Sequence, residues 1–359
     1  MNELEELPSL TNDPRPYYAK WQETEGLDVV RGMFVEDLRQ VPLKPWKRKG
    51  ALGAYINLEG TGGENDAYLC EIPPGGSLRP QKHLYEETIF ILDGAGATSI
   101  WLEGETKVSF EWQSGSLFSP PINTWHQHFN TQGNKPVRYV AVTLAPLIMN
   151  IFHNSEFIFK DSFQFRDRYD GQQNYFNSEG RLSKSPEIGI RIWETNFIPD
   201  VLKIDLIEWK ERGAGGKSIF FECSENSIAA HMSQFPVGTY KKAHRHGPGA
   251  HVIILNGEGY TLMWQENQPV QRYDWKEGSL VVPPERWFHQ HFNIGREPAT
   301  YLALHARQSI KHKSGKKMPG YDKNVKEGGD QIEYEDEDPA VKQMFADELK
   351  KRQIPNQMH

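Results

Sequence analysis

The sequence predicts an all-β fold in which one antiparallel barrel occurs twice in tandem. Between residues 51 and 145 the chain consists of short apolar or alternating stretches separated by turn residues. Residues 89–92 (IFIL), for example, are an apolar strand, and Asp93 and Gly94 after them are typical of a hairpin turn. The second observation is a repeat, because the same pattern returns in the second half of the chain.

The repeat keeps one spacing throughout. His83 is separated from His246 by the same length of chain that separates His126 from His289. The sequences around these histidines are also alike, as PPINTWHQHFN and PPERWFHQHFN show. A constant separation at nine positions indicates a duplicated domain. The nine pairs are Gly75 and Gly238, Gln81 and His244, His83 and His246, Glu87 and Ala250, Gly94 and Gly257, Gly115 and Gly278, Pro121 and Pro284, His126 and His289, and Asn130 and Asn293.

The two repeats occupy residues 49–148 and 209–306, and an arm of residues 1–48 precedes them. Prolines punctuate this arm, and we expect a short helix over Tyr17–Val30 that ends near Gly32. The arm should wrap around a barrel or a neighbouring subunit, because its large aromatic side chains need burial. These side chains are Tyr18, Trp21 and Trp46.

A connector of residues 149–208 and a tail of residues 307–359 complete the chain. The connector is too long and too aromatic for a bare linker, so we expect it to be helical and partly buried. The tail is strongly polar at first, which predicts an extended or flexible segment. Asp338 and Pro339 are then typical of a helix start, with the helix running to about Lys351.

Composition excludes several classes of protein. The 359 residues carry a net charge of −7, which argues against a general nucleic-acid binder, and the basic patch Lys311–Lys317 is offset by acidic residues further along. No apolar run reaches membrane-spanning length, and the acidic N-terminus is unlike a secretory signal. Only Cys70 and Cys223 are present, so we expect a cytoplasmic protein with two reduced, buried thiols.

Three histidines of the second repeat predict a metal site. His244 and His246 are two residues apart, so on a strand their side chains project to one face, and His289 arrives on a later strand. Three neutral imidazoles suit a mid-to-late first-row metal with open coordination positions. Iron(II) fits best, while manganese, nickel, cobalt and copper are compatible with these ligands. The alternative is that the histidines are surface or core residues of a binding barrel.

The spacing around these histidines resembles the two signatures of the cupin family. One signature runs from Gly238 through His244, His246 and Ala250 to Gly257, and the other from Gly278 through Pro284 and His289 to Asn293. The resemblance implies two antiparallel jelly-roll barrels, each with a metal pocket in its mouth, and association into a homo-oligomer. The family carries a glutamate where this chain has Ala250. His251 beside it should point away from the pocket.

The first repeat also departs from the family pattern at one ligand, but at a different position: it keeps the glutamate and lacks the first histidine. Gln81 stands where a histidine is expected, while His83, Glu87 and His126 are present. These four residues are a candidate second metal site, with the Gln81 carbonyl as a weak donor. The alternative is a vestigial site in which His83 and Glu87 hydrogen-bond each other. If one repeat is catalytic, we choose the second.

The stretch AHRHGPGA…GEGYT, residues 243–261, narrows the resemblance to gentisate-type ring-cleaving dioxygenases. These bicupins also lack the glutamate and bind iron through three histidines. The resemblance implies that iron(II) chelates a hydroxylated aromatic substrate and also binds O2, and that both oxygen atoms enter the cleaved product. Two departures are that the working site there is usually in the first barrel, and that Val252 stands where those proteins carry an arginine for the substrate carboxylate.

Two nearby residues are the candidate catalytic residues. Arg286 or His291 could hold a substrate carboxylate in place of the missing arginine. His291 lies two beyond His289, so it should share the inward face as a proton relay or as a supporting hydrogen-bond partner. Three aromatic residues are candidates for the pocket lining, although core packing is their commoner role. They are Trp264, Trp287 and Phe288.

Three functions are compatible with these residues. The first is an iron-dependent dioxygenase that cleaves the ring of a gentisate-, salicylate- or hydroquinone-like compound. The second is a manganese-dependent bicupin decarboxylase or isomerase, for which Glu87 is the best support and Ala250 the main objection. The third is a non-catalytic binding bicupin, which the retained histidines disfavour.

Overall fold

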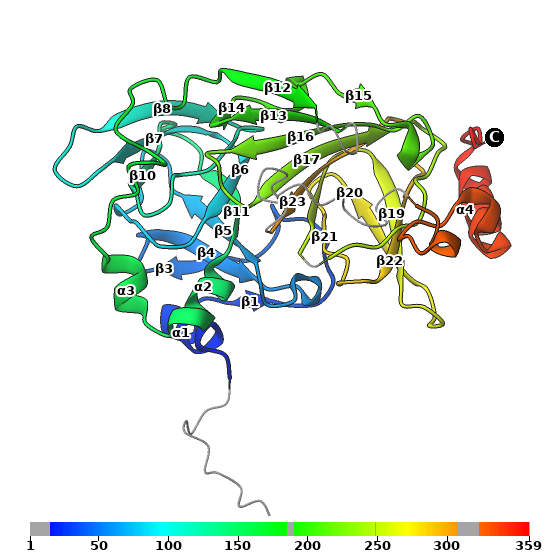
Figure 1. Cartoon of the computed structure of the whole chain (residues 1–359), viewed down its shortest axis with the longest axis horizontal. Helices are drawn as coiled ribbons and strands as arrows, with labels where there is room; N and C mark the ends of the chain where they lie inside the picture. Colours follow the sequence, from blue (N-terminus) through cyan, green and yellow to red (C-terminus); the bar gives the residue numbers. More distant parts are fainter. Residues whose placement is uncertain (1–14, 185–189, 248, 307–322, 359) are drawn as a thin grey trace, which may run out of the picture.

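The computed structural model describes residues 15–184, 190–247, 249–306 and 323–358. Its architecture is two β units side by side, each made of one large sheet and one three-stranded sheet (Figure 1). The four described α-helices lie at the periphery of these sheets (Figure 1). The prediction of an all-β fold with two antiparallel units in tandem is confirmed.

The first repeat forms an eight-stranded sheet with the order β1-β4-β5-β11-β6-β9-β14, to which β3 adds at β4, and a three-stranded sheet with the order β10-β7-β8. The predicted strand 89–92 lies within β6, and β11 pairs antiparallel with both β5 and β6. The strands are β1 (Val29–Val30), β3 (Lys44–Trp46), β4 (Ala51–Ile56), β5 (Asp66–Ile72), β6 (Glu87–Asp93), β7 (Ala95–Trp101), β8 (Val108–Gln113), β9 (Leu117–Phe118), β10 (Trp125–Asn130) and β11 (Val137–Thr143).

The second repeat copies this arrangement. Its large sheet has the order β12-β13-β16-β17-β23-β18-β21-β2, with β15 at β16, and its small sheet has the order β20-β19-β22. The strands are β12 (Gly180–Lys184), β13 (Arg191–Thr195), β15 (Ile207–Glu208), β16 (Lys217–Cys223), β17 (Ala229–Phe235), β18 (His251–Asn256), β19 (Glu258–Trp264), β20 (Gln271–Lys276), β21 (Leu280–Val281), β22 (Phe288–Asn293) and β23 (Ala299–His305).

The two repeats exchange edge strands. β2 (Phe34–Val35) comes from the arm but pairs with β21 of the second repeat. β14 (Phe197–Ile198) comes from the connector but pairs with β9 of the first repeat. These two strands keep the same separation along the chain as the paired histidines, so the duplication reaches into the arm and the connector. The division into five segments stays a prediction, since the arm and the connector each complete the sheet of a repeat.

A shared core joins the large sheets. One apolar cluster contains Leu69 and Phe90 of the first repeat together with Met232 and Ile253 of the second. Strands such as β6 and β23 are buried along almost their whole length, as expected for sheets covered on both faces. The exchanged strands and the common core therefore fix one repeat against the other.

The arm begins with α1 (Tyr17–Glu25), which ends at Gly26 in the left-handed conformation (φ 70°). The predicted helix over Tyr17–Val30 is therefore too long, because this glycine ends it and residues 29–30 become β1. Tyr18, Trp21 and Trp46 are buried against the first repeat, as expected from their size.

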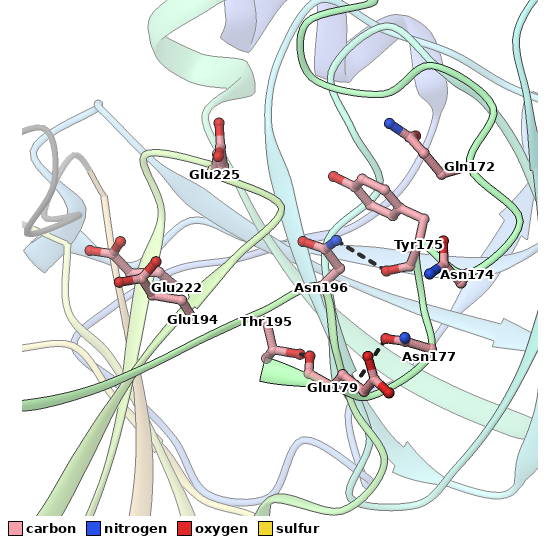
Figure 2. Close-up of a pocket in the computed structure, with 10 residues that line it drawn as sticks. All are labelled: Gln172, Asn174, Tyr175, Asn177, Glu179, Glu194, Thr195, Asn196, Glu222 and Glu225. Carbon is pink, nitrogen blue, oxygen red and sulfur yellow. Dashed lines mark hydrogen bonds between the residues drawn. The ribbon is translucent and has the colours of Figure 1, made fainter. Parts of the chain in front are cut away.

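The connector is α-helical only in its first part. It starts with α2 (Ala145–Phe152) and α3 (Ser155–Lys160) and then supplies β12, β13 and β14, so the expectation of a helical connection is wrong for its second half. An open cleft lies where the connector meets the second repeat (Figure 2). Two of its polar side chains are engaged in hydrogen bonds within the cleft, since Asn196 donates to the Tyr175 carbonyl and Thr195 donates to that of Glu179. The cleft has no histidine among its lining residues.

The tail packs on the second repeat. Asp338 accepts a hydrogen bond from the Ala340 N–H and begins α4 (Pro339–Arg352), which confirms the predicted helix start. Residues 323–337 are not the extended or flexible segment that composition predicted, because Gln331 is 1% exposed and bridges to His244. The predicted basic patch Lys311–Lys317 lies outside the described residues. Among the described helices, none is long and apolar enough to cross a membrane.

Candidate metal centre

The three predicted histidines of the second repeat meet in the structure. His244 and His246 lie in an extended segment that precedes β18, and a β-bridge joins His244 to His289 of β22. The ring centroid of His289 is 4.3 Å from that of His244 and 4.7 Å from that of His246. Each residue offers one nitrogen, and these nitrogens all lie within 4.8 Å of one another.

Backbone carbonyls orient the rings. The Nδ1 atoms of His244, His246 and His289 lie 3.1, 2.8 and 3.3 Å from the carbonyl oxygens of Lys242, Gly247 and Trp287. A carbonyl oxygen only accepts, so each Nδ1 carries the proton and donates it. The three Nε2 atoms are therefore unprotonated and carry lone pairs, the arrangement in which histidines bind a metal.

The environment keeps two of the rings neutral. Burial, followed by the charge of Arg212, lowers the pKa of His244 well below its usual value. Burial and the neighbouring His246 do the same to the pKa of His289. Neutral imidazoles ready to donate lone pairs fit a divalent metal ion.

Ala250 and Val252 line the cavity beside the histidines, as the alternation of β-strand side chains predicted. The missing glutamate thus leaves a methyl group, and no carboxylate replaces it among the described lining residues. His251 faces the other repeat, where its Nδ1 lies 3.3 Å from the Asn65 amide nitrogen. Its position agrees with the expectation that it points away from the pocket.

Several cavity residues were not found from the sequence. Lys241, Arg212 and Tyr301 are not ligand positions of the two signatures, so no motif marked them. Lys241 donates hydrogen bonds to the Ser233 and Tyr301 hydroxyls, the latter at 3.1 Å. The other lining residues that were missed are Trp209, His231, Ser233, Ala303 and His305.

The cavity is narrow. The space that admits the centre of a water molecule is about 20 Å³, which is room for an ion or one water. His231 and His305 form part of the wall as a stacked, hydrogen-bonded pair with 2.7 Å between their nitrogens. Binding of a larger ligand therefore requires residues that line the cavity to move.

His291 lines this cavity and is held by a hydrogen bond to Thr261. Trp275 donates to the Thr261 hydroxyl at 3.0 Å, and that hydroxyl lies 2.8 Å from Nδ1 of His291. While it accepts from Trp275, the hydroxyl can donate its own proton to Nδ1, and in that tautomer Nε2 of His291 carries the N–H. Burial, followed by the charge of Lys241, lowers the pKa of His291 to about 3, so the ring is a neutral donor.

Arg286 and the predicted pocket aromatics lie elsewhere. The Arg286 guanidinium forms an ion pair of 2.9 Å with Asp330 of the tail, half of its side chain is exposed, and it does not line the cavity. Trp264 and Phe288 stack on each other, and Trp287 packs against an apolar cluster. The assignment of Arg286 to a substrate carboxylate is not supported, because Asp330 already holds its charge.

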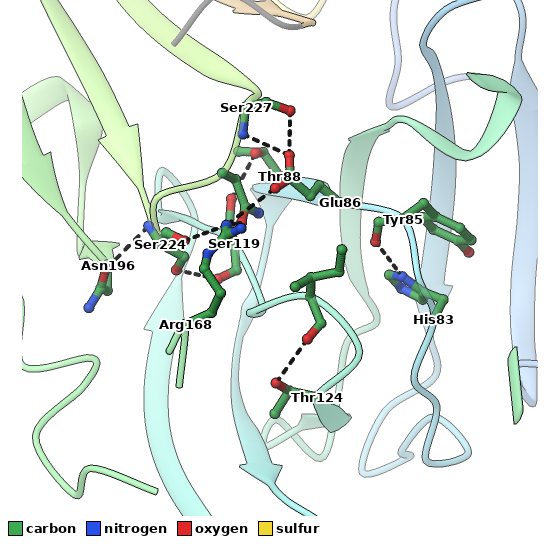
Figure 3. Close-up of polar contacts among 12 residues, drawn as sticks. His83, Tyr85, Glu86, Thr88, Ser119, Thr124, Arg168, Asn196, Ser224 and Ser227 are labelled. Atoms are coloured by element: carbon green, nitrogen blue, oxygen red, sulfur yellow. Dashed lines mark hydrogen bonds and ion pairs between the residues drawn. The ribbon is translucent and has the colours of Figure 1, made fainter. Parts of the chain in front are cut away.

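The first repeat also gathers its predicted ligands. Nε2 of His83 and of His126 each lies 3.5 Å from Oε1 of Glu87. The Nδ1 atoms of these histidines donate to the carbonyls of Tyr85 and Thr124 (Figure 3 shows that of His83), so lone pairs face the carboxylate. Neither Nε2 of His83 nor Oε1 of Glu87 has a hydrogen-bond partner among the described residues. Converging acceptors without a donor fit a bound cation.

Gln81 and Lys49 complete this cluster. The Gln81 amide nitrogen lies 3.1 Å from Nε2 of His126. Lys49 donates to the Tyr68 hydroxyl at 2.9 Å, and Tyr68 donates to Glu87 at 2.7 Å. Burial lowers the pKa of Lys49 to about 8, although the Glu87 charge opposes this shift.

The loop that carries Glu87 is held by the second repeat. Glu86 accepts hydrogen bonds from the main chain and side chain of Ser227, and it also pairs with Arg168 of the connector at 3.2 Å (Figure 3). Ser224 donates to the carbonyl of Ser119, which extends the contact to the next loop (Figure 3). The first cluster is therefore braced across the boundary between the repeats.

Comparison with known proteins agrees with this arrangement. Residues 68–143 match the family model described as a cupin domain. The same sheets are present in both halves of the chain, and two of the three residues in each cluster occupy equivalent positions. The chain has the architecture of a bicupin. The cupin match covers β5 to β11, the strands that carry the first ligand cluster.

Solved bicupins have the same fold. The oxalate decarboxylase of Lactobacillus farciminis, in a formate complex, aligns with a TM-score of 0.50 and 13% identity over 77% of this chain and 86% of that chain. A Bacillus subtilis oxalate decarboxylase, studied for its Mn(II) centres, aligns with a TM-score of 0.50 and 16% identity over 85% and 87%. At such identities the likeness concerns the fold.

One curated relative matches by sequence. A stretch of 66 residues is 36% identical to a gentisate 1,2-dioxygenase of a Ralstonia species. The match spans 18% of this chain and 17% of that relative's length. The proteins that it resembles are thus enzymes, and its two clusters, one of three histidines and one of two histidines with Glu87, support a metal cofactor.

Proposed function

We propose that this bicupin is an iron(II)-dependent dioxygenase that cleaves the ring of a hydroxylated aromatic compound. His244, His246 and His289 of the second repeat are assigned as its metal ligands. The observation that carries the proposal is that three unprotonated Nε2 atoms line the cavity and no carboxylate does. A metal ion bound by these three ligands keeps coordination positions for both the substrate and O2. The local similarity to a gentisate 1,2-dioxygenase supports it.

A bound iron(II) ion supplies the redox chemistry and the common site at which the phenol and O2 are activated. The protein orients the substrate, controls a proton near it and lines part of the cavity with apolar side chains. Nε2–H of His291 points into the cavity and can donate a hydrogen bond to a substrate oxygen on which negative charge develops. Ala250 and Val252 leave the opposite wall apolar.

Binding of an aromatic ring requires the cavity to widen. Trp209 precedes the 3₁₀ turn Lys210–Arg212, and Arg212 is its last residue. Both line the cavity, so this short turn is the wall segment that we assign to the opening. Arg212 also donates to Gln331 of the tail at 3.5 Å. Outward movement of the turn therefore exchanges a contact with the tail for a contact with substrate.

The decisive experiment is anaerobic loading of the full-length protein with iron(II), followed by an oxygen electrode with catechols, hydroquinones, salicylates and gentisates. The expected result is one O2 consumed per ring cleaved, with both atoms of ¹⁸O2 in the product. His289→Ala should abolish this uptake. No O2 uptake with any phenol would exclude the proposal.

The second candidate is a manganese-dependent decarboxylase. The narrow cavity favours it, since a small diacid needs less space than an aromatic ring. The first repeat offers the carboxylate that this chemistry prefers, because Glu87 joins His83 and His126 there. Release of CO2 from oxalate by the manganese-loaded protein, without net O2 uptake, would select this candidate.

We also propose that the first cluster binds a divalent ion through His83, Glu87 and His126. Nε2 of His83 and Oε1 of Glu87, which have no hydrogen-bond partner among the described residues, support it together with the nearby Nε2 of His126. A turned Gln81 amide adds its Oε1 as a fourth donor. Metal analysis should then give two ions per chain.

A further inference from the structure

The duplication allows the charges of the two cavities to be compared position by position. Lys49 and Arg212 are equivalent, because the Lys49 carbonyl accepts from Arg79 N–H and the Arg212 carbonyl accepts from Lys242 N–H. Arg79 and Lys242 are themselves equivalent, since they keep the constant separation of the repeat. Each repeat therefore places one buried cation at the same point beside its ligand cluster.

In the first repeat this cation is balanced. Lys49, Tyr68 and Glu87 form a continuous hydrogen-bonded chain with steps of 2.9 and 2.7 Å. One ammonium and one carboxylate are thus linked inside the protein, the condition under which buried charges are tolerated. Leu78, three residues before Gln81, contributes no charge.

In the second repeat the residue charges differ from those of the first at two positions. Ala250 stands in place of Glu87, which removes the negative charge, and Lys241 stands in place of Leu78, which adds a positive charge. Lys241 and Arg212 both line the cavity, and none of the described lining residues is acidic. Relative to the first cavity, two substitutions have each shifted the charge by one positive unit.

The Lys241 ammonium is held in place by neutral groups. It is 3% exposed, and its two hydrogen-bond acceptors among the described residues are the hydroxyls of Ser233 and Tyr301. An ammonium has three donors, so one remains for a guest in the cavity that it lines. Burial, followed by the charge of Arg212, lowers the pKa of Lys241 to about 7, and an anion between them would reverse this shift.

We propose that Lys241 and Arg212 form an anion-binding subsite beside the three histidines, and that the subsite takes a carboxylate of the substrate. The substrate is thereby an aromatic hydroxy acid rather than a neutral phenol, an assignment that rests on the proposed function for the aromatic ring. Lys241 supplies a point charge, and Arg212 supplies a planar donor pair suited to a carboxylate. This pair takes the role that the sequence suggested for Arg286.

The test compares salicylate with salicylamide, which keeps the hydroxyl and the ring but is neutral. Binding to the full-length, zinc-loaded protein is measured by calorimetry, because zinc permits binding without turnover. Salicylate should bind at least about tenfold more tightly than salicylamide, as expected for charge-assisted hydrogen bonds. Equal affinities would overturn the proposal without the use of any variant.

Variants then locate the subsite. Lys241→Met should weaken salicylate by about tenfold or more and change salicylamide by less than about twofold, while Lys241→Arg should restore most of the salicylate affinity. Lys242→Met is the matched control, since Lys242 pairs with Glu333 of the tail and does not line the cavity. Loss of both ligands in Lys241→Met with Lys241→Arg equally impaired would show a structural role and overturn the subsite.

The outcome is separable from that of the dioxygenase proposal. Charge-dependent binding of salicylate through Lys241, with no O2 uptake by the iron-loaded protein, retains the subsite and removes the dioxygenase. O2 uptake with neutral phenols, without preference for their carboxylated forms, retains the dioxygenase and removes the subsite.

Discussion

Lys49 and Arg212 occupy equivalent places in the two repeats but face opposite electrostatic surroundings. Lys49 reaches Glu87 through Tyr68, whereas Arg212 shares its cavity with Lys241 and no described acidic side chain. The equivalent basic residue is thus linked to a carboxylate in the first repeat and lies beside a second basic residue in the other.

Removal of a second-repeat histidine should remove one metal ion per chain. In His244→Ala the site loses one of three ligand atoms, so we expect affinity to fall at least about 100-fold. Chelator competition and elemental analysis measure this loss. His153→Ala, which changes an exposed histidine outside both clusters, should leave the metal content unaltered. Unchanged stoichiometry in His244→Ala would show that the bound ion belongs to the first repeat alone.

Ala250→Glu should convert the second cavity toward the charge state of the first. The new carboxylate lies beside the histidines and neutralises part of the positive charge, so metal affinity should rise and salicylate affinity should fall by about tenfold. Ala250→Gln is the matched control, because it adds nearly the same volume, with an overpacking cost of about 1–3 kcal/mol, but no charge. If both variants bind salicylate equally, volume rather than charge controls the site.

Binding of salicylate should weaken as the pH rises through 7. The pKa of Lys241 is lowered to about 7 by burial and then by Arg212, so the ammonium is present below this pH and lost above it. The affinity should therefore be flat below about pH 6 and fall by up to about tenfold per unit well above pH 7. Calorimetry between pH 5.5 and about 9 measures the slope.

Three other groups beside Lys241 do not titrate in this window. Burial lowers the pKa of His231 far below its usual value and that of His291 to about 3, and burial raises the pKa of Tyr301. Lys241→Arg should accordingly flatten the profile, and a profile that keeps its slope in this variant assigns the titration to another group.

Lys49→Met should destabilise the first repeat. It leaves the buried Glu87 carboxylate without its cation, and breaking a buried pair from one side costs about 3–5 kcal/mol. The double variant Lys49→Met with Glu87→Gln should recover most of that loss, because no charge remains unpaired. Urea unfolding of the metal-free protein gives both values. Additive effects of the two substitutions would show that the two charges do not interact.

The strands and ligands could be predicted from local signals. Apolar stretches with turn residues marked β6, and the constant separation of matching residues marked the duplication. His244, His246 and His289 stood in signatures with fixed spacing, so their meeting point followed from strand geometry. The position of Val252 and the outward direction of His251 followed from the same alternation.

The contacts between distant segments could not be predicted. The exchange of β2 and β14 leaves no local trace, because two-residue strands carry no period. Gln331 looked like part of a solvated tail, yet it is buried beside His244. Arg286 had the right spacing for a cavity residue, but its positive φ of 62° and the partner Asp330 turn it to the surface.

The sequence by itself determined the duplicated β architecture, the cupin resemblance and the trio of histidines, because periodicity and spacing act over a few residues. Only the tertiary structure decided which charges surround that trio. Lys241 and Arg212 reach the cavity from separate segments. The electrostatic potential that they create there depends on the missing carboxylate at Ala250 and on burial from water. Charge interactions act through space, so only the packed chain shows which of them are balanced.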